Sequence, residues 1–174
     1  MAEKKKRTII LLCVVVALAV LLVGLVLAWR ASTGDVVSDG TLRLTAGDTP
    51  LKTYTYEEIC AFPTASVEKT ITSSKEADES GVFTGVPLEL LLDDADPGWR
   101  GKYTEFLFHA SDGFVASVFL SDIEKGENVL VVYEKDGAPL PGPEEGGKGP
   151  LRIVVADDPF GNRSAYLLTG VEAL

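Results

Sequence analysis

Residues 128–155 read NVLVVYEKDGAPLPGPEEGGKGPLRIVV, and this stretch contains the pattern that decides the fold. Residues 128–133 form a continuous apolar run, which predicts a buried strand, and residues 134–137 predict a turn. From Pro139 to Pro150 the chain has repeated Gly and Pro and no hydrophobic periodicity, so we expect a long loop. Residues 151–156 form a second apolar run. The stretch therefore predicts two buried strands joined by a glycine-rich loop.

Arg152 lies inside the second apolar run, between a leucine and an isoleucine. A guanidinium among buried apolar side chains costs free energy unless it is paired, so we expect Arg152 to contact a carboxylate, a carbonyl or a ligand anion. The glycines around Lys148, including Gly149, precede it, and backbone N–H groups of such a loop can hold a phosphate. Two interpretations stay open: Arg152 helps to bind an anion, or it braces its own long loop.

Shorter elements precede and follow this stretch. Thr55 with Glu58 three residues later predicts a helix start with a capping box, and Pro87 near the beginning of an apolar stripe predicts a second helix that starts at Gly85. A turn is expected at residues 47–50, and a charged surface loop is expected at residues 74–81. The remaining expected strands are residues 41–44, 66–73, 103–110, 114–120 and 162–174. Short strands with two short helices predict an α+β fold.

The N-terminal region differs from the rest of the chain. Residues 8–29 are 22 consecutive uncharged and mostly apolar residues, enough for about 33 Å of helix against a hydrocarbon core of roughly 30 Å. The basic residues 4–7 precede this run, and positive charge stays on the cytoplasmic side. We expect a single-pass cell-membrane anchor with a cytoplasmic tail at residues 1–7. A cleaved signal peptide is the alternative.

The charge balance limits the partners of the outer region. After a linker at residues 30–40, we expect an extracytoplasmic domain at residues 41–174. From residue 31 onward the chain has 11 basic and 25 acidic residues, a net charge of −14. Nucleic acid requires a basic surface, so we expect no nucleic-acid partner. The expected partners are the membrane, through the N-terminal helix, and a second membrane or envelope protein.

Cysteine and histidine are scarce. The chain has two cysteines, Cys13 in the predicted anchor and Cys60 beyond it, and one histidine, His109. We therefore expect no disulfide within the outer domain, and the usual zinc sites cannot be assembled. His109 is interpreted as a polar residue near a strand end, with general-base or ligand chemistry as the alternative.

Three stretches, in order, resemble the molybdopterin-binding oxidoreductase domain of the sulfite oxidase family. They are residues 83–91, residues 111–114 with Asp122 downstream, and residues 129–152; residues 161–171 are similar to the closing strand of that family. The resemblance spans residues 41–174. It implies a compact mixed α+β fold of the sulfite oxidase type, here preceded by one transmembrane helix, and it implies molybdopterin as a cofactor.

The chain also departs from that family. Active members bind molybdenum through a cysteine thiolate before the Gly-Val-Pro-Leu segment, but residues 70–74 read Thr-Ile-Thr-Ser-Ser, and Cys60 lies earlier. Tyr166 stands where the family places a lysine on the cofactor phosphate. Without the thiolate, molybdenum ligation is not expected, and no catalytic or metal-binding residue is assigned. The candidate cofactor-binding residues are Arg152, Arg163, Lys148 and Gly149.

Three functions follow from these observations. We expect a membrane-anchored extracytoplasmic domain that keeps the fold and acts as a non-catalytic ligand-binding or interaction module. The alternative is an active molybdopterin-dependent oxidoreductase that passes electrons to a membrane partner, which would require Cys60 or another donor to approach the metal. The third is a structural role in an envelope complex, without a ligand pocket. The position of Cys60 relative to Arg152, Arg163 and His109 discriminates between the first two.

Overall fold

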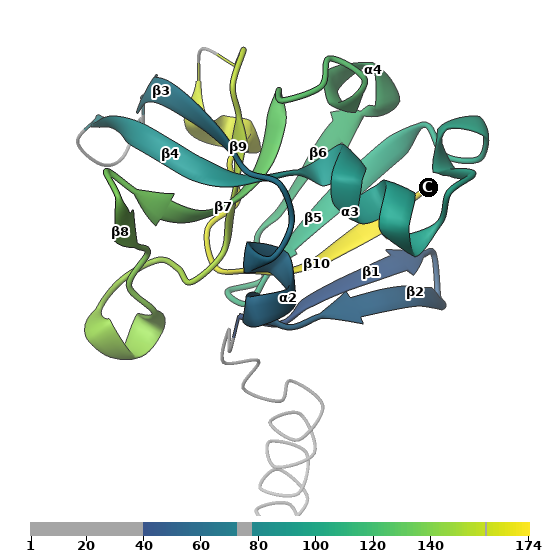
Figure 1. Ribbon diagram of the computed structural model, residues 1–174, viewed down its shortest axis with the longest axis horizontal. Helices are drawn as coiled ribbons and strands as arrows, with labels where there is room; N and C mark the ends of the chain where they lie inside the picture. The colour runs from purple at the N-terminus through teal and green to yellow at the C-terminus, as the bar shows by residue number, and fades with distance from the viewer. Residues whose placement is uncertain (1–39, 73–77, 159) are drawn as a thin grey trace, which may run out of the picture. The chain divides into compact units, whose positions relative to one another are not determined.

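Strands dominate the computed structural model, which describes residues 40–72, 78–158 and 160–174. They form two five-stranded sheets (Figure 1). Sheet A has the order β2-β1-β10-β5-β6. Strand β1 runs parallel to β10, and the other neighbouring pairs are antiparallel. Its strands are β1 (Leu42–Ala46), β2 (Thr49–Tyr54), β5 (Glu105–Ala110), β6 (Val115–Phe119) and β10 (Leu168–Ala173).

Sheet B contains the stretch that was expected to decide the fold. Strand β7 is central: it pairs with β4 on one side and with β9 and the short β8 on the other, and β3 pairs with β4. All of these pairs are antiparallel. The strands are β3 (Ala65–Ile71), β4 (Glu79–Pro87), β7 (Val129–Lys135), β8 (Ala138–Pro139) and β9 (Arg152–Val155). The two predicted buried strands are thus confirmed, and they are direct neighbours.

The helices are short. Those of the α type are α2 (Tyr56–Cys60), α3 (Leu88–Ala95) and α4 (Leu120–Ile123), and the 3₁₀ turns are η1 (Trp99–Gly101), η2 (Pro143–Glu145) and η3 (Gly161–Arg163). The predicted capping box of α2 is confirmed, because Glu58 N–H donates to Thr55 Oγ1 at 3.3 Å and Thr55 N–H donates to Glu58 Oε2 at 2.8 Å.

Several predicted boundaries were wrong. The helix expected from Gly85 begins at Leu88, because residues 85–87 pair with β7 as the end of β4. Residues 49–54 form a strand, whereas a turn was expected at residues 47–50. Pro50 is tolerated in this strand because β2 is an edge strand. The strand expected at residues 114–120 gives way to α4 at Leu120, and the final strand begins at Leu168.

The main hydrophobic core lies between the two sheets. Val131 and Tyr133 of β7 belong to it, together with Phe106 and Phe108 of sheet A. The alternate residues of β7, Leu130 and Val132, belong to a second, smaller cluster that also contains Phe83, Val154, Ala65 and Ile71. Both faces of sheet B are therefore covered, which explains why residues 129–133 are apolar without alternation.

A β-bulge interrupts the pairing of β4 with β7. Gly85 pairs with Val132 but Thr84 pairs with Glu134, so Tyr133 is the extra residue. The backbones approach so closely that a Cβ on Gly85 would lie 2.2 Å from the Val131 carbonyl oxygen. The extra residue shifts the alternation of side chains by one position. As a result, Lys135 lies on the same face of the sheet as Val132.

The expected membrane anchor, residues 8–29, and most of the expected linker lie outside the described residues. Within the described ranges, no helix is long and apolar enough to span a membrane. The anchor and the orientation of the chain stay predictions.

Candidate functional site

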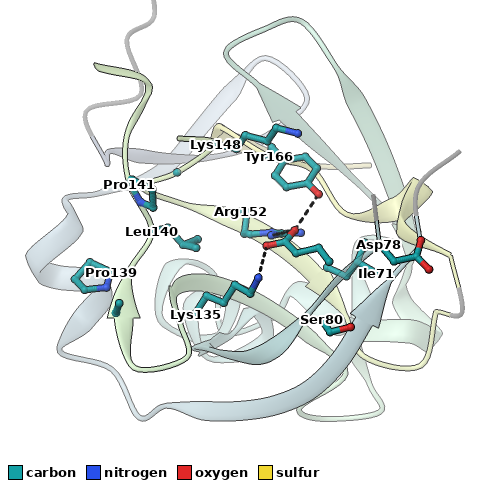
Figure 2. A pocket seen from close by; sticks show the side chains of 13 residues that line it. Ile71, Asp78, Ser80, Lys135, Pro139, Leu140, Pro141, Lys148, Arg152 and Tyr166 are labelled. Carbon is teal, nitrogen blue, oxygen red and sulfur yellow. Dashed lines mark hydrogen bonds and ion pairs between the residues drawn. The ribbon is translucent and has the colours of Figure 1, made fainter. Parts of the chain in front are cut away.

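A pocket of about 690 Å³ lies on the face of sheet B that points away from the main core (Figure 2). Its apolar side is formed by Ile71 at the end of β3 and by residues 138–141, which include β8. Of the described residues that line it, three are basic and two are acidic, a net charge of +1: Lys135, Lys148, Arg152, Asp78 and Glu79. The pocket therefore combines an apolar wall with a cluster of charged groups.

Arg152 is the most buried of these charged residues, with 2% of its side chain exposed. Its Nη1 donates to Glu79 Oε2 at 2.9 Å. The guanidinium carbon lies 4.2 Å from the centre of the Tyr166 ring and 5.0 Å from that of Phe83. Nε and Nη2 are buried and have no hydrogen-bond partner in the described part of the chain. Leaving buried donors unpaired is costly, so this arginine is only partly satisfied.

Glu79 is the group that neutralises this cluster. Its carboxylate accepts from Arg152, from the Tyr166 hydroxyl at 3.2 Å and from Lys135 Nζ at 3.2 Å (Figure 2). Burial raises the pKa of this carboxyl, but the charges and hydrogen bonds of Arg152 and Lys135 outweigh burial and hold the pKa below its usual range. Glu79 is therefore ionised at neutral pH.

Tyr166 is positioned by the backbone on either side of it. Ala165 O accepts from Ile153 N–H at 2.8 Å, and Leu167 N–H donates to Lys148 O at 3.0 Å. These two bonds hold residues 165–167 beside β9 and the end of the glycine-rich loop. Lys148 Nζ lies 4.7 Å from the centre of the Tyr166 ring. The aromatic ring thus contacts both Lys148 and Arg152.

The glycine-rich loop does not form the expected backbone cradle. Gly147 N–H donates to Gly142 O at 2.9 Å, and Gly149 N–H donates to Pro141 O at 2.9 Å. A Cβ on Gly149 would lie 2.6 Å from Leu140 Cβ, so this glycine allows the loop to fold closely on itself. These N–H groups are used within the loop and are not directed at a ligand.

The structure separates the four residues assigned to cofactor binding. Arg152, Lys148 and Gly149 line the same pocket. Arg163 does not line it: its Nε lies 2.9 Å from Asp158 and its Nη1 lies 2.9 Å from Asp122. Bracing of the long loop by Arg152 is not observed either, since Glu79 belongs to β4.

Cys60 is not part of the pocket. It lies in α2 and packs against the main core. Tyr56 contacts Tyr133, which faces that core, so Cys60 lies on the opposite face of sheet B from Arg152. Burial raises the pKa of its thiol. A thiol held in this way is a poor metal ligand.

The remaining metal-ligating residue types do not converge. His109 Nε2 lies 3.0 Å from Glu172 Oε2 on sheet A, away from the pocket. Within residues 40–72, 78–158 and 160–174, no group of His, Cys, Asp and Glu is arranged to hold a metal ion.

Sequence reasoning missed three residues of the site. Glu79 was assigned to a charged surface loop, Lys135 to a turn, and Tyr166 was seen only as a departure from a family pattern. The one available signal was the buried Arg152, which requires an acceptor without saying which one.

Comparison with known proteins identifies the family of this chain. Residues 37–174 match the oxidoreductase molybdopterin binding domain. The chain belongs to that family. The expected molybdopterin-binding fold is thereby confirmed, and it is a mixed fold that is rich in sheet and has few helices. No curated protein matches the chain.

One solved structure similar to this molybdopterin-binding domain is the sulfane dehydrogenase SoxCD from Paracoccus pantotrophus. The TM-score is 0.63 and the sequence identity is 16%, with 78% of this chain and 38% of that chain covered. At this identity the likeness shows the fold alone. The chain thus matches well under half the length of that relative.

The residues of the pocket fit one part of the family's cofactor better than another. Arg152 offers two unpartnered N–H groups, which suit a phosphate or another oxyanion. Molybdenum requires a soft donor, and no sulfur atom is found among the described residues that line the pocket. The pocket therefore fits an anionic group and does not fit the metal.

Proposed function

We propose that this member of the oxidoreductase molybdopterin-binding domain family is a non-catalytic ligand-binding module. The observation that carries the proposal is Arg152, a buried guanidinium at the pocket with Nε and Nη2 unpartnered within the described residues. An arginine that served only to brace the fold would have its donors paired. An oxyanion bound in the pocket would supply the missing acceptors.

The ligand is an anionic molecule, with the phosphate of a pterin as one source of the anion. Arg152 would hold it through Nε and Nη2, and Lys148 would add positive charge beside Tyr166. Gly149 contributes by allowing the close approach of the loop to Leu140. Arg163 acts elsewhere, because Asp122 and Asp158 already pair with it.

We propose that the module is not catalytic because no cysteine sulfur lies where it could bind the metal. Residues 70–74, where the family's thiolate would be expected, contain no cysteine. Cys60 packs on the other side of sheet B. The alternative, an active molybdopterin-dependent oxidoreductase that passes electrons to a membrane partner, is favoured by family membership. It would require Cys60 to approach the metal, or another donor to replace the thiolate.

The proposal also places the module on a membrane. The uncharged run of residues 8–29 with basic residues 4–7 before it supports a single-pass anchor in the cell membrane with a cytoplasmic N-terminus. The ligand-binding domain would then lie outside the membrane, where a second membrane or envelope protein could contact it.

The test is the metal and pterin content of the full chain, purified in detergent from a host that makes molybdenum cofactor. Pterin without molybdenum, lost in Arg152→Met and retained in the matched control Arg163→Met, would support the proposal. Stoichiometric molybdenum would overturn it in favour of the oxidoreductase. If neither is found, titration with simple oxyanions decides whether the pocket binds anions at all.

A further inference from the structure

We infer that the pocket selects ligands whose anionic group carries a single negative charge, and that Glu79 is the residue that imposes this selection. The inference rests on the proposed function, because it assumes that Arg152 receives an anion. It adds the charge, the binding mode and the chemical class of that ligand.

The binding mode follows from the geometry of the guanidinium. The Nε–H and Nη2–H groups of an arginine point in the same direction and form one edge that binds two oxygens side by side. In Arg152 these are the two unpartnered nitrogens within the described part of the chain, whereas Nη1 is bound to Glu79. The rings of Phe83 and Tyr166 contact the guanidinium. A ligand therefore meets Arg152 through the Nε and Nη2 edge, with two oxygens of one oxyanion.

The charge of the ligand follows from Glu79. Its carboxylate is fixed by Arg152, Lys135 and Tyr166, so it remains beside the guanidinium when a ligand binds at the neighbouring edge. With Asp78 and Lys148 included, the charged side chains lining the described pocket sum to +1. A monoanion matches this charge. A dianion adds a second negative charge close to the Glu79 carboxylate in a partly desolvated site, where charge repulsion is strong.

The rest of the ligand is apolar. The wall opposite the charged groups consists of Ile71, Ala138, Pro139, Leu140 and Pro141, and the volume of about 690 Å³ suits a small organic molecule rather than a bare ion. The chemical class is therefore a carboxylate, a sulfonate or a phosphate ester in its singly charged form, on a body with an apolar face.

The inference is tested with three probes added to the full chain at constant ionic strength. Methanesulfonate and sulfate have nearly the same size and differ by one charge, and benzenesulfonate adds an apolar body. The readout is the NMR signal of the Arg152 Nε–H group, identified by its absence in Arg152→Lys. We expect benzenesulfonate to bind most tightly, and methanesulfonate to bind about tenfold or more tightly than sulfate.

The variant Glu79→Gln removes the resident charge and retains an oxygen acceptor. It should reduce the preference for methanesulfonate over sulfate by about tenfold or more. Glu68→Gln is the matched control: Glu68 is an exposed glutamate on β3 of the same sheet, outside the pocket, and its replacement should leave the preference unchanged.

The outcomes separate this inference from the proposed function. Sulfate binding as tight as that of methanesulfonate in the unmodified chain, or an unchanged preference in Glu79→Gln, would overturn the selection by charge while the anion pocket remained. If no probe moves the Arg152 signal, the proposed anion pocket fails, and the inference fails with it. The comparison in the unmodified chain needs no variant, so the test holds even if Glu79→Gln does not fold.

Discussion

The chain contains two arginines in similar chemical settings with different degrees of satisfaction. Arg163, with 31% of its side chain exposed, has Asp158 on Nε and Asp122 on Nη1. Arg152, with 2% exposed, has Glu79 on Nη1 and no partner for Nε or Nη2 among the described residues. The less accessible arginine thus has fewer partners. This is the reverse of what burial requires for structure alone.

The two arginines have different roles. The carboxylates around Arg163 join η3 to α4 and to the loop after β9, which is a structural role. Around Arg152, one carboxylate and two aromatic rings fix the guanidinium while one of its edges stays unpaired in the described structure. A partly paired, rigidly held arginine is suited to receive a ligand.

The largest effect is expected from Arg152→Ala. The substitution leaves Glu79 without its main counterion and removes the cation that contacts Phe83 and Tyr166, so the free energy of unfolding should fall by about 3–5 kcal/mol. Urea denaturation of the full chain measures this. Unchanged stability together with lost anion binding would show that Arg152 has no structural role.

A smaller loss of stability is expected from Arg163→Ala, about 1–3 kcal/mol, because Asp122 and Asp158 lose a partner at a partly exposed site. Lys125 lies 3.4 Å from Asp122 and compensates in part. Anion binding at Arg152, followed in parallel by NMR, should not change. Weakened binding would mean that Arg163 belongs to the ligand site after all.

The stability of the unmodified chain and that of Glu79→Gln are expected to depend differently on pH. Because the pKa of Glu79 is lowered in the folded state, its ionised form stabilises the fold fully above its ordinary value near 4.5, and this contribution is lost as the pH falls below that value. The stability of the unmodified chain should therefore decrease more steeply with acid. Parallel acid-denaturation curves for the two proteins would contradict the ion pairing of Glu79.

The smallest effect is expected from Cys60→Ser. The thiol packs as a partly buried group against the main core, so the loss of stability should be about 1 kcal/mol or less. Anion binding and pterin content should be unchanged. A loss of bound molybdenum in this variant would instead identify Cys60 as a metal ligand and revive the oxidoreductase alternative.

The parts of the fold that could be predicted from the sequence are those set by local pattern. The apolar runs at residues 129–133 and 152–155 predict their own burial, and the pair Thr55 and Glu58 predicts its capping box. Burial of Arg152 in an apolar run was enough to predict that it is paired or binds an anion.

The rest depends on pairing between distant strands. Glu79 reaches Arg152 only because β4 and β9 both flank β7, and nothing in residues 74–81 indicates that alignment. Lys135 reaches the pocket only because of the bulge at Tyr133. The glycines near Lys148 suggested a phosphate loop, yet the hydrogen bonds of Gly147 and Gly149 to their own loop decide otherwise. Register and loop conformation are properties of the whole fold.

The bulge at Tyr133 makes the electrostatics of the pocket depend on how β7 pairs with β4 as well as on amino-acid composition. Lys135 follows Glu134 directly, and in a strand adjacent residues point to opposite faces. If β7 paired with β4 without the bulge and kept all of its residues, regular alternation from Val132 would present Glu134 to the pocket in place of Lys135. A cationic position would become anionic without any amino-acid substitution. In this strand, a one-residue shift of register would reverse a charge in the pocket.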